Sequence, residues 1–222
     1  MFRFIKKACS KGRRATTRCL GDKGTSGDKH SKRDQKSLDV AISNEDIDVA
    51  IDLCQKMNIK THGLEDGALS LHWAAHLGRV NVVRELINKG GEINVKTKDG
   101  KTPLYLASRN GHVKVVKFLI DNKADIETND ENGMTPLHWA SCNGHLEVVK
   151  LLVDNKANVN VKDKDGWTPL YRASSTGHLG AVKFLVENKA DINAILENGW
   201  TPQSVAELFG HKDVAEYLRS IG

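Results

Sequence analysis

A short motif recurs along this chain every 33 residues, and this spacing limits the possible folds more than any other feature. The motif reads Thr-Pro-Leu-Tyr where it starts at Thr102, and related motifs start at Thr135, Thr168 and Thr201. One step earlier, Leu71 stands in the Leu position of the motif. A constant period without gaps indicates repeated units that stack side by side, each burying its apolar face against its neighbours.

Each unit is predicted to contain two short helices joined by a tight turn. A Thr before Pro is a good helix cap, and Pro suits the first helical position. A glycine suited to ending the first helix recurs at the same period, as Gly78, Gly111, Gly144, Gly177 and Gly210. A second helix follows, because its apolar residues have helical spacing. In one unit these residues are Val115, Val116, Leu119 and Ile120.

The motif, the turn glycine and the period together resemble the ankyrin repeat. The resemblance covers about residues 36–222 and implies an all-α solenoid of antiparallel helix pairs with projecting β-turn fingers. The expected units are an N-terminal cap at 36–68, full repeats at 69–101, 102–134, 135–167 and 168–200, and a C-terminal cap at 201–222.

One column departs from the family pattern, which has a glycine after the second helix. Gly90 keeps it, but the next three units have Lys123, Lys156 and Lys189. If the family geometry holds, each lysine adopts a left-handed conformation at a cost of roughly 1 kcal/mol. The alternative is that the preceding residue, Asn122, Asn155 or Asn188, takes this conformation instead.

No recognisable catalytic or metal-binding motif is present. The four cysteines are far apart, which argues against a disulfide framework or a zinc knuckle and favours a reducing compartment. His72 and His76 are four residues apart, but no acidic third ligand lies near them in sequence. No apolar run is long enough to span a membrane. We therefore expect no enzyme activity, no cofactor and no metal site.

Charge divides the chain into a basic tail and a mildly acidic body. Residues 1–35 hold 11 Lys or Arg against 3 Asp or Glu, and their composition predicts disorder. The residues suited to targeting are Lys6, Lys7, Lys11, Arg13 and Arg14. Four interpretations stay open for the tail: a solvated arm, a membrane-surface anchor, a nuclear signal or a mitochondrial presequence.

The ankyrin resemblance implies a protein-interaction scaffold or adaptor, with the partner in a concave groove. The alternative is an adaptor whose basic tail supplies the main contact, with the nucleus or an anionic membrane. We expect a cytoplasmic monomer, with the nucleus and the membrane periphery as alternative locations. Mixed charge in the repeats makes direct nucleic-acid binding by them unexpected.

Two columns are expected to line the groove in such a fold. The residues before Thr-Pro include Met134, Trp167 and Trp200, which we expect to form a partly exposed ladder. The residues before the turn glycines add Leu77, Arg109, Asn110, Cys142, Asn143, Leu208 and Phe209. The competing interpretation is that the tryptophans are half-buried scaffold.

Two asparagines match the pattern for asparaginyl hydroxylation that occurs in many ankyrin proteins. Asn94 and Asn193 each follow an acidic and an aliphatic residue, with a leucine eight residues earlier. The competing interpretation is that these side chains only form hydrogen bonds within the turn.

Overall fold

The computed structural model describes residues 37, 40 and 66–222, and every regular element in them is helical. The helices that it bounds are α4 (Asp66–His76), α5 (Val80–Asn88), α6 (Pro103–Arg109), α7 (Val113–Asp121), α8 (Pro136–Cys142), α9 (Leu146–Asp154), α10 (Pro169–Thr176), α11 (Leu179–Glu187), α12 (Pro202–Leu208) and α13 (Lys212–Ile221).

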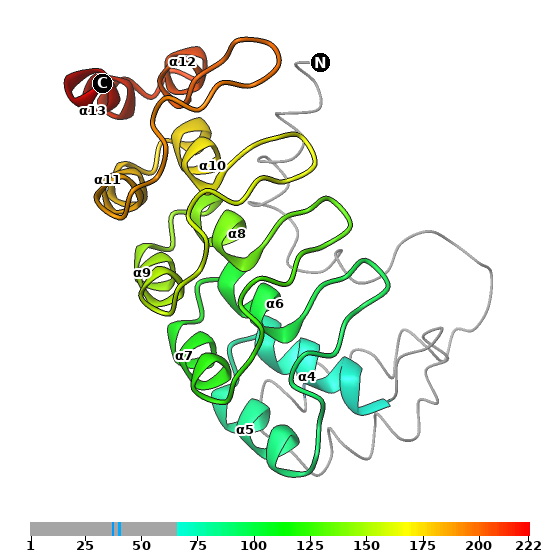
Figure 1. Ribbon diagram of the computed structural model, residues 1–222. Helices are drawn as coiled ribbons and strands as arrows, with labels where there is room; N and C mark the ends of the chain where they lie inside the picture. The colour runs from blue at the N-terminus through cyan, green and yellow to red at the C-terminus, as the bar shows by residue number, and fades with distance from the viewer. Residues whose placement is uncertain (1–36, 38–39, 41–65) are drawn as a thin grey trace.

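These helices stack as antiparallel pairs, from α4 with α5 to α12 with α13 (Figure 1). The first helix of each pair packs against the first helices of the neighbouring pairs, and the second helices form a parallel row. The loops between pairs project as fingers from the first-helix side (Figure 1). Adjacent fingers are bonded to each other, since the Glu131 amide donates to the Asp99 carbonyl at 2.9 Å. The predicted all-α solenoid is confirmed.

From α6 onward, each first helix begins at the Thr-Pro step. Thr102 has extended backbone, and its hydroxyl accepts the amide hydrogen of Tyr105 at 3.2 Å. Pro103 takes the first helical position, where a missing amide hydrogen costs nothing. In α8 the cap is reciprocal, because the Thr135 amide also donates to Nδ1 of His138 at 3.1 Å.

The apolar stripes of the second helices form the core between the two helix rows. All four stripe residues of α7 are buried, as the spacing predicts, and so are their counterparts in α9: Val148, Val149, Leu152 and Val153. Small residues of the first helices, such as Ala107 and Ala140, are fully buried against them. This core is one cluster that runs through the described repeats.

A ladder of histidines links each pair to the preceding one. Nε2 of His112 donates to the carbonyl of His76 at 2.8 Å, and Nε2 of His145 donates to the carbonyl of Arg109 at 3.0 Å. The His112 ring lies so close to Gly78 that a Cβ there would be 2.5 Å from Nδ1. Gly78 also has φ of 73°, so the turn needs glycine for two separate reasons.

The three lysines of the divergent column adopt the left-handed conformation. Lys123, Lys156 and Lys189 have φ values of 68°, 73° and 69°. The preceding asparagines have negative φ, for example −93° at Asn155, so the alternative that they relieve the lysines is wrong. The turn closes on a backbone bond that needs this geometry, from the amide of the next residue, Ala157, to the Leu152 carbonyl at 3.0 Å.

The predicted tail at 1–35, its five targeting residues and most of the cap at 36–68 lie outside the described residues. α4 begins at Asp66, three residues before the expected start of its repeat. The repeat boundaries themselves stay a prediction. None of the helices described has the length and apolar character that crossing a membrane would require.

Candidate partner-binding face

The candidate site combines the ends of the first helices with the bases of the fingers, and we call this surface the inner face. It comprises Lys101, Met134, Trp167 and Trp200 before the Thr-Pro motifs, and the pairs His76–Leu77, Arg109–Asn110, Cys142–Asn143, Ser175–Thr176 and Leu208–Phe209 before the turn glycines. Packing joins the two sets, because Trp200 and Phe209 lie against the same apolar cluster.

The expected ladder of exposed side chains is wrong for two of its three members. Met134 is 5% exposed and Trp167 is 6% exposed, whereas Trp200 is partly exposed. Met134 packs with Tyr105 and Leu106, and Trp167 packs with Tyr171 of α10 and Val205 of α12. Both side chains are therefore scaffold. Cys142 is buried as well, at 6%.

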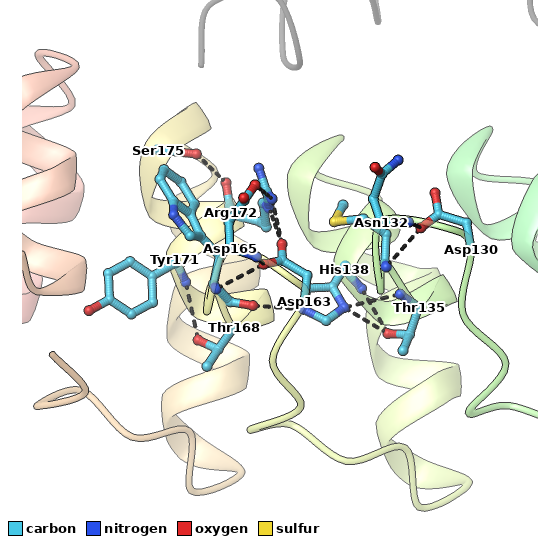
Figure 2. A network of polar contacts seen from close by, with 12 residues as sticks. Asp130, Asn132, Thr135, His138, Asp163, Asp165, Thr168, Tyr171, Arg172 and Ser175 are labelled. Carbon is cyan, nitrogen blue, oxygen red and sulfur yellow. Dashed lines mark hydrogen bonds and ion pairs between the residues drawn. The ribbon is translucent and has the colours of Figure 1, made fainter. Parts of the chain in front are cut away.

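Two aspartates at the finger bases hold the backbone of Met134 and Trp167. Oδ1 of Asp130 accepts the amide hydrogens of Asn132 and Met134, both at 2.9 Å (Figure 2). Oδ1 of Asp163 does the same for Asp165 and Trp167, both at 3.0 Å. These bonds close the finger on itself and fix the backbone of the residue before Thr-Pro.

Asp163 also pairs with Arg172 of α10, a residue that the sequence analysis did not identify (Figure 2). Nε of Arg172 donates to Oδ2 of Asp163 at 3.0 Å, and Nη2 contacts the same oxygen. The guanidinium lies over the Trp167 ring, 4.7 Å from its centroid. The sequence did contain a signal, because Arg172 is the one charged residue in a column that is otherwise apolar. The same position holds Trp139 in the preceding unit and Val205 in the following one.

The middle of the inner face presents fixed carboxamides. Nδ2 of Asn110 donates to Nδ1 of His76 at 2.8 Å and to the His76 carbonyl at 3.2 Å. Nδ2 of Asn143 donates to the Arg109 carbonyl at 2.7 Å. The two carboxamide oxygens accept no hydrogen bond within the part of the chain that the structure describes. The bonds from Nδ2 therefore hold both oxygens in fixed positions.

The N-terminal part of the inner face carries positive charge. The Arg109 guanidinium lies 4.4 Å from the centroid of the Trp139 ring, which fixes its position on α6. Burial lowers the pKa of His76, and the neighbouring charges of Arg109 and His112 lower it further. Lys101 adds a second cation, which contacts Asp99 at 3.0 Å.

The C-terminal end of the inner face is apolar. Leu208 is 43% exposed, and the next residue, partly exposed Phe209, packs against the same cluster as partly exposed Trp200 of the adjoining finger. Ile195, on the same finger, is 68% exposed. Ile195 was not predicted from the sequence. It is recognisable there as an apolar residue in a column that is polar in the preceding fingers, with Lys96, Asn129 and Lys162.

The buried histidine of the Thr-Pro motif is structural. His138 is fully buried, its Nε2 donates to the Trp167 carbonyl at 3.0 Å, and its Nδ1 accepts from Thr135. Burial lowers the pKa of His138, which suits a neutral ring with both nitrogens bonded. In the described part of the chain, no three potential ligands cluster as a metal site would require.

The two asparagines that match the hydroxylation pattern have different surroundings. Oδ1 of Asn94 accepts the amide hydrogen of Asp125 in the next repeat at 2.8 Å, a bond between repeats and not within one turn. Oδ1 of Asn160 likewise accepts the amide hydrogen of Asp191 at 2.8 Å. Asn193 is exposed, and its amide hydrogen binds the Asp191 carboxylate at 3.0 Å.

Comparison with known proteins agrees with the geometry. The model of a family described as ankyrin repeats (3 copies) matches residues 38–130, 71–163, 122–196 and 157–222. No significant match was found among curated proteins. Domains of this family are typically non-catalytic and generally act as protein-interaction modules. The stacked helix pairs and the overlapping matches over most of its length place this chain in the ankyrin-repeat family.

Proposed function

We propose that this chain is a scaffold or adaptor that holds a partner protein on its inner face. The observation that carries the proposal is the apolar group at the C-terminal end of this face, where Leu208 is 43% exposed and Phe209 and Trp200 are partly exposed. Apolar side chains gathered on one surface and flanked by polar ones are typical of interaction sites. The general role of ankyrin repeats supports the same function.

The proposed contact residues differ from the sequence prediction, because Met134, Trp167 and Cys142 are buried. The remaining candidates are Leu77, Arg109, Asn110, Asn143, Trp200, Leu208 and Phe209. Trp and Arg are enriched among residues that dominate binding energy. Trp200 and Arg109 are thus the strongest single candidates.

Site-specific photo-crosslinking tests the proposal. A photoreactive residue at Asn143 or Thr176 samples the inner face, and one at Asn81 or Lys117 samples the exposed side of the second helices. In cells of the source organism, the inner-face positions should capture one protein that the control positions do not. Capture only at the control positions, or equal capture at all four, would show that the partner binds elsewhere.

A second candidate role follows from the charge of the tail. Residues 1–35 carry 11 basic against 3 acidic residues, which suits targeting to the nucleus or to an anionic membrane. Under this proposal the tail supplies the main localising contact, and the repeats carry the cargo. A fluorescent reporter fused to residues 1–35 should concentrate at one of these places. A diffuse reporter would contradict the role.

Hydroxylation of Asn94 and Asn193 is proposed on the sequence pattern. Of the two, exposed Asn193 is the more accessible, since the side chain of Asn94 is bonded to the next repeat. Peptide mass spectrometry of protein from its native host should show an added oxygen at Asn193. Unmodified peptides at both positions would refute the proposal.

A further inference from the structure

We propose that the inner face binds an extended peptide segment in one direction, with an acidic side chain at α6 and a bulky apolar side chain at α12. This inference rests on the proposed function, because it describes the partner segment that the same face would recognise. Four observations carry it: an apolar end, a cationic end, fixed acceptors between them, and the spacing of the first helices.

The apolar end lies on the last helix pair and its finger, whereas Leu77, the apolar residue before the first described turn glycine, packs against the core. At the position before the turn glycine, Phe209 replaces the polar residues Asn110, Asn143 and Thr176 of the three preceding repeats. One residue earlier, exposed Leu208 replaces buried Ser175 and Cys142. The adjoining finger exposes Ile195 in a column that is otherwise polar. Leu208 and Phe209 are adjacent in α12, and Phe209 packs against the same cluster as Trp200, so this end of the face suits a bulky apolar side chain of the ligand.

The cationic end lies on α4, α6 and the finger between their repeats. Arg109 is held over the Trp139 ring at 4.4 Å and supplies the main charge, because Lys101 at the base of the finger is paired with Asp99 at 3.0 Å. A guanidinium in a fixed position suits a carboxylate, because its donors match the two oxygens. The C-terminal end of the face has no comparable cation among the described inner-face residues. Charge therefore gives the ligand a direction.

The acceptors between the two ends favour an extended ligand. The carboxamide oxygens of Asn110 and Asn143 are held in place by bonds from Nδ2 to the preceding repeat, at 3.2 and 2.7 Å. An extended peptide has backbone N–H groups that need acceptors, whereas those of a helix are already satisfied within it. The ligand should therefore donate main-chain hydrogen bonds to these two side chains.

Helix spacing sets the length of the segment. α6, α8, α10 and α12 pack in series, and neighbouring packed helices are about 8–10 Å apart. Three such steps cover roughly 27 Å, and an extended chain advances about 3.3 Å per residue. The acidic and apolar side chains should thus lie about eight residues apart in the ligand.

Selection from a random peptide library displayed on phage tests this inference on the full-length chain. Enriched peptides should carry Asp or Glu at one end and Trp, Phe or Leu about eight residues away, in one constant order. Enrichment of basic peptides, of peptides without an acid or of both orders would overturn the inference and leave the proposed function standing. Failure to enrich any peptide would overturn the inference too. Only the photo-crosslinking result decides the proposed function.

Two variants test which end of the inner face binds the acidic side chain of the peptide and which binds the apolar one. Each variant is checked for unchanged helix content. With Arg109→Glu, the enriched peptides should carry Lys or Arg in place of the acidic residue. The double change Leu208→Ser with Phe209→Thr copies Ser175–Thr176 of the preceding repeat, so the last pair should still fold. It should weaken binding of the selected peptide on the order of tenfold. Unchanged selection or affinity in either variant would contradict the proposed end.

The matched control removes an exposed apolar side chain away from the inner face. Val113 is 39% exposed at the start of α7, and Lys212 occupies its column in α13. Val113→Lys should leave the selected peptides and their affinity unchanged. An equal loss with Val113→Lys would show that the effect of the double change is not specific to the inner face.

Discussion

At the scale of single residues, three lysines hold backbone strain that a glycine would relieve. Lys123, Lys156 and Lys189 all have positive φ, whereas Gly90 takes the same place in the first described repeat with φ of 94°. A side chain in the left-handed region costs about 1 kcal/mol. The strain recurs once per repeat, so relief at one lysine should be measurable alone.

Lys156→Gly is expected to raise the melting temperature and to increase the free energy of unfolding by roughly 1 kcal/mol. Asn155→Gly is the matched control, because Asn155 has φ of −93° and gains nothing from glycine. It should leave stability unchanged or lower it. Thermal melts of both variants beside the wild type make the comparison, and an unchanged or lower melting temperature for Lys156→Gly would contradict the strain argument.

The buried histidine makes stability depend on pH. Burial lowers the pKa of His138 in the folded state below its ordinary value of about 6.5. The unfolded chain then binds more protons than the folded chain, so stability falls as pH drops below about 6.5. Burial also lowers the pKa of His76 and His145, which act in the same direction.

His138→Tyr is expected to reduce this pH dependence without removing it. The neighbouring repeats already carry Tyr105 and Tyr171 in this column, so the first helix accommodates the ring. The pKa of Tyr171 is raised to about 12 by burial, so a tyrosine here does not titrate near neutral pH. Urea midpoints between pH 5 and 7.5 provide the measurement. Identical pH profiles for variant and wild type would show that His138 does not contribute.

At the scale of helices and turns, the contact between neighbouring pairs depends on glycines that face histidine rings. A Cβ on Gly144 would lie 2.4 Å from Nδ1 of His178, and Gly144 has φ of 71°. Gly199 has a similar φ of 80°, but nothing lies within 4 Å of a Cβ built there. Comparing substitutions at the two positions therefore separates the cost of backbone strain from the cost of pushing two neighbouring helix pairs apart.

Gly144→Ala should therefore destabilise the protein clearly more than Gly199→Ala, which should cost only about 1 kcal/mol for its backbone conformation. Denaturant unfolding of the two variants measures both costs. The additional loss at Gly144 reports the close approach of the His178 ring. Equal losses would mean that the ring moves aside at no cost.

At the scale of the whole molecule, stability is spread over contacts between neighbouring pairs. α9 packs against both α7 and α11, whereas α13 packs against α11 and its own partner α12. In such a linear array, a central pair supports two neighbours and a terminal pair only one. A similar loss of packing should thus have different consequences at the two places.

Leu152→Ala in α9 and Leu218→Ala in α13 each remove a buried leucine, at a typical cost of about 2–5 kcal/mol. Leu218→Ala should reduce hydrogen-exchange protection mainly in α12 and α13. Leu152→Ala should reduce it on both sides of α9. If both variants lowered protection uniformly, the described repeats would be unfolding as a single cooperative unit.

Much of the fold follows from the sequence alone, because its signals are local. The Thr-Pro caps, the turn glycines and the helical apolar stripe each act within a few residues of themselves. Repetition every 33 residues then determines that successive units stack in the same way. The left-handed lysines belong to this group, since the turn imposes one backbone geometry on whichever residue occupies it.

Only the tertiary structure decided which side chains of the inner face are exposed. Sequence placed Met134, Trp167 and Trp200 in one column, but a side chain's burial depends on what lies against it. Met134 is buried against Tyr105 and Leu106, and Trp167 against Tyr171 and Val205, whereas Trp200 is only partly buried against its cluster. These contacts join a finger to helices elsewhere in the chain, so the helical period alone does not contain them.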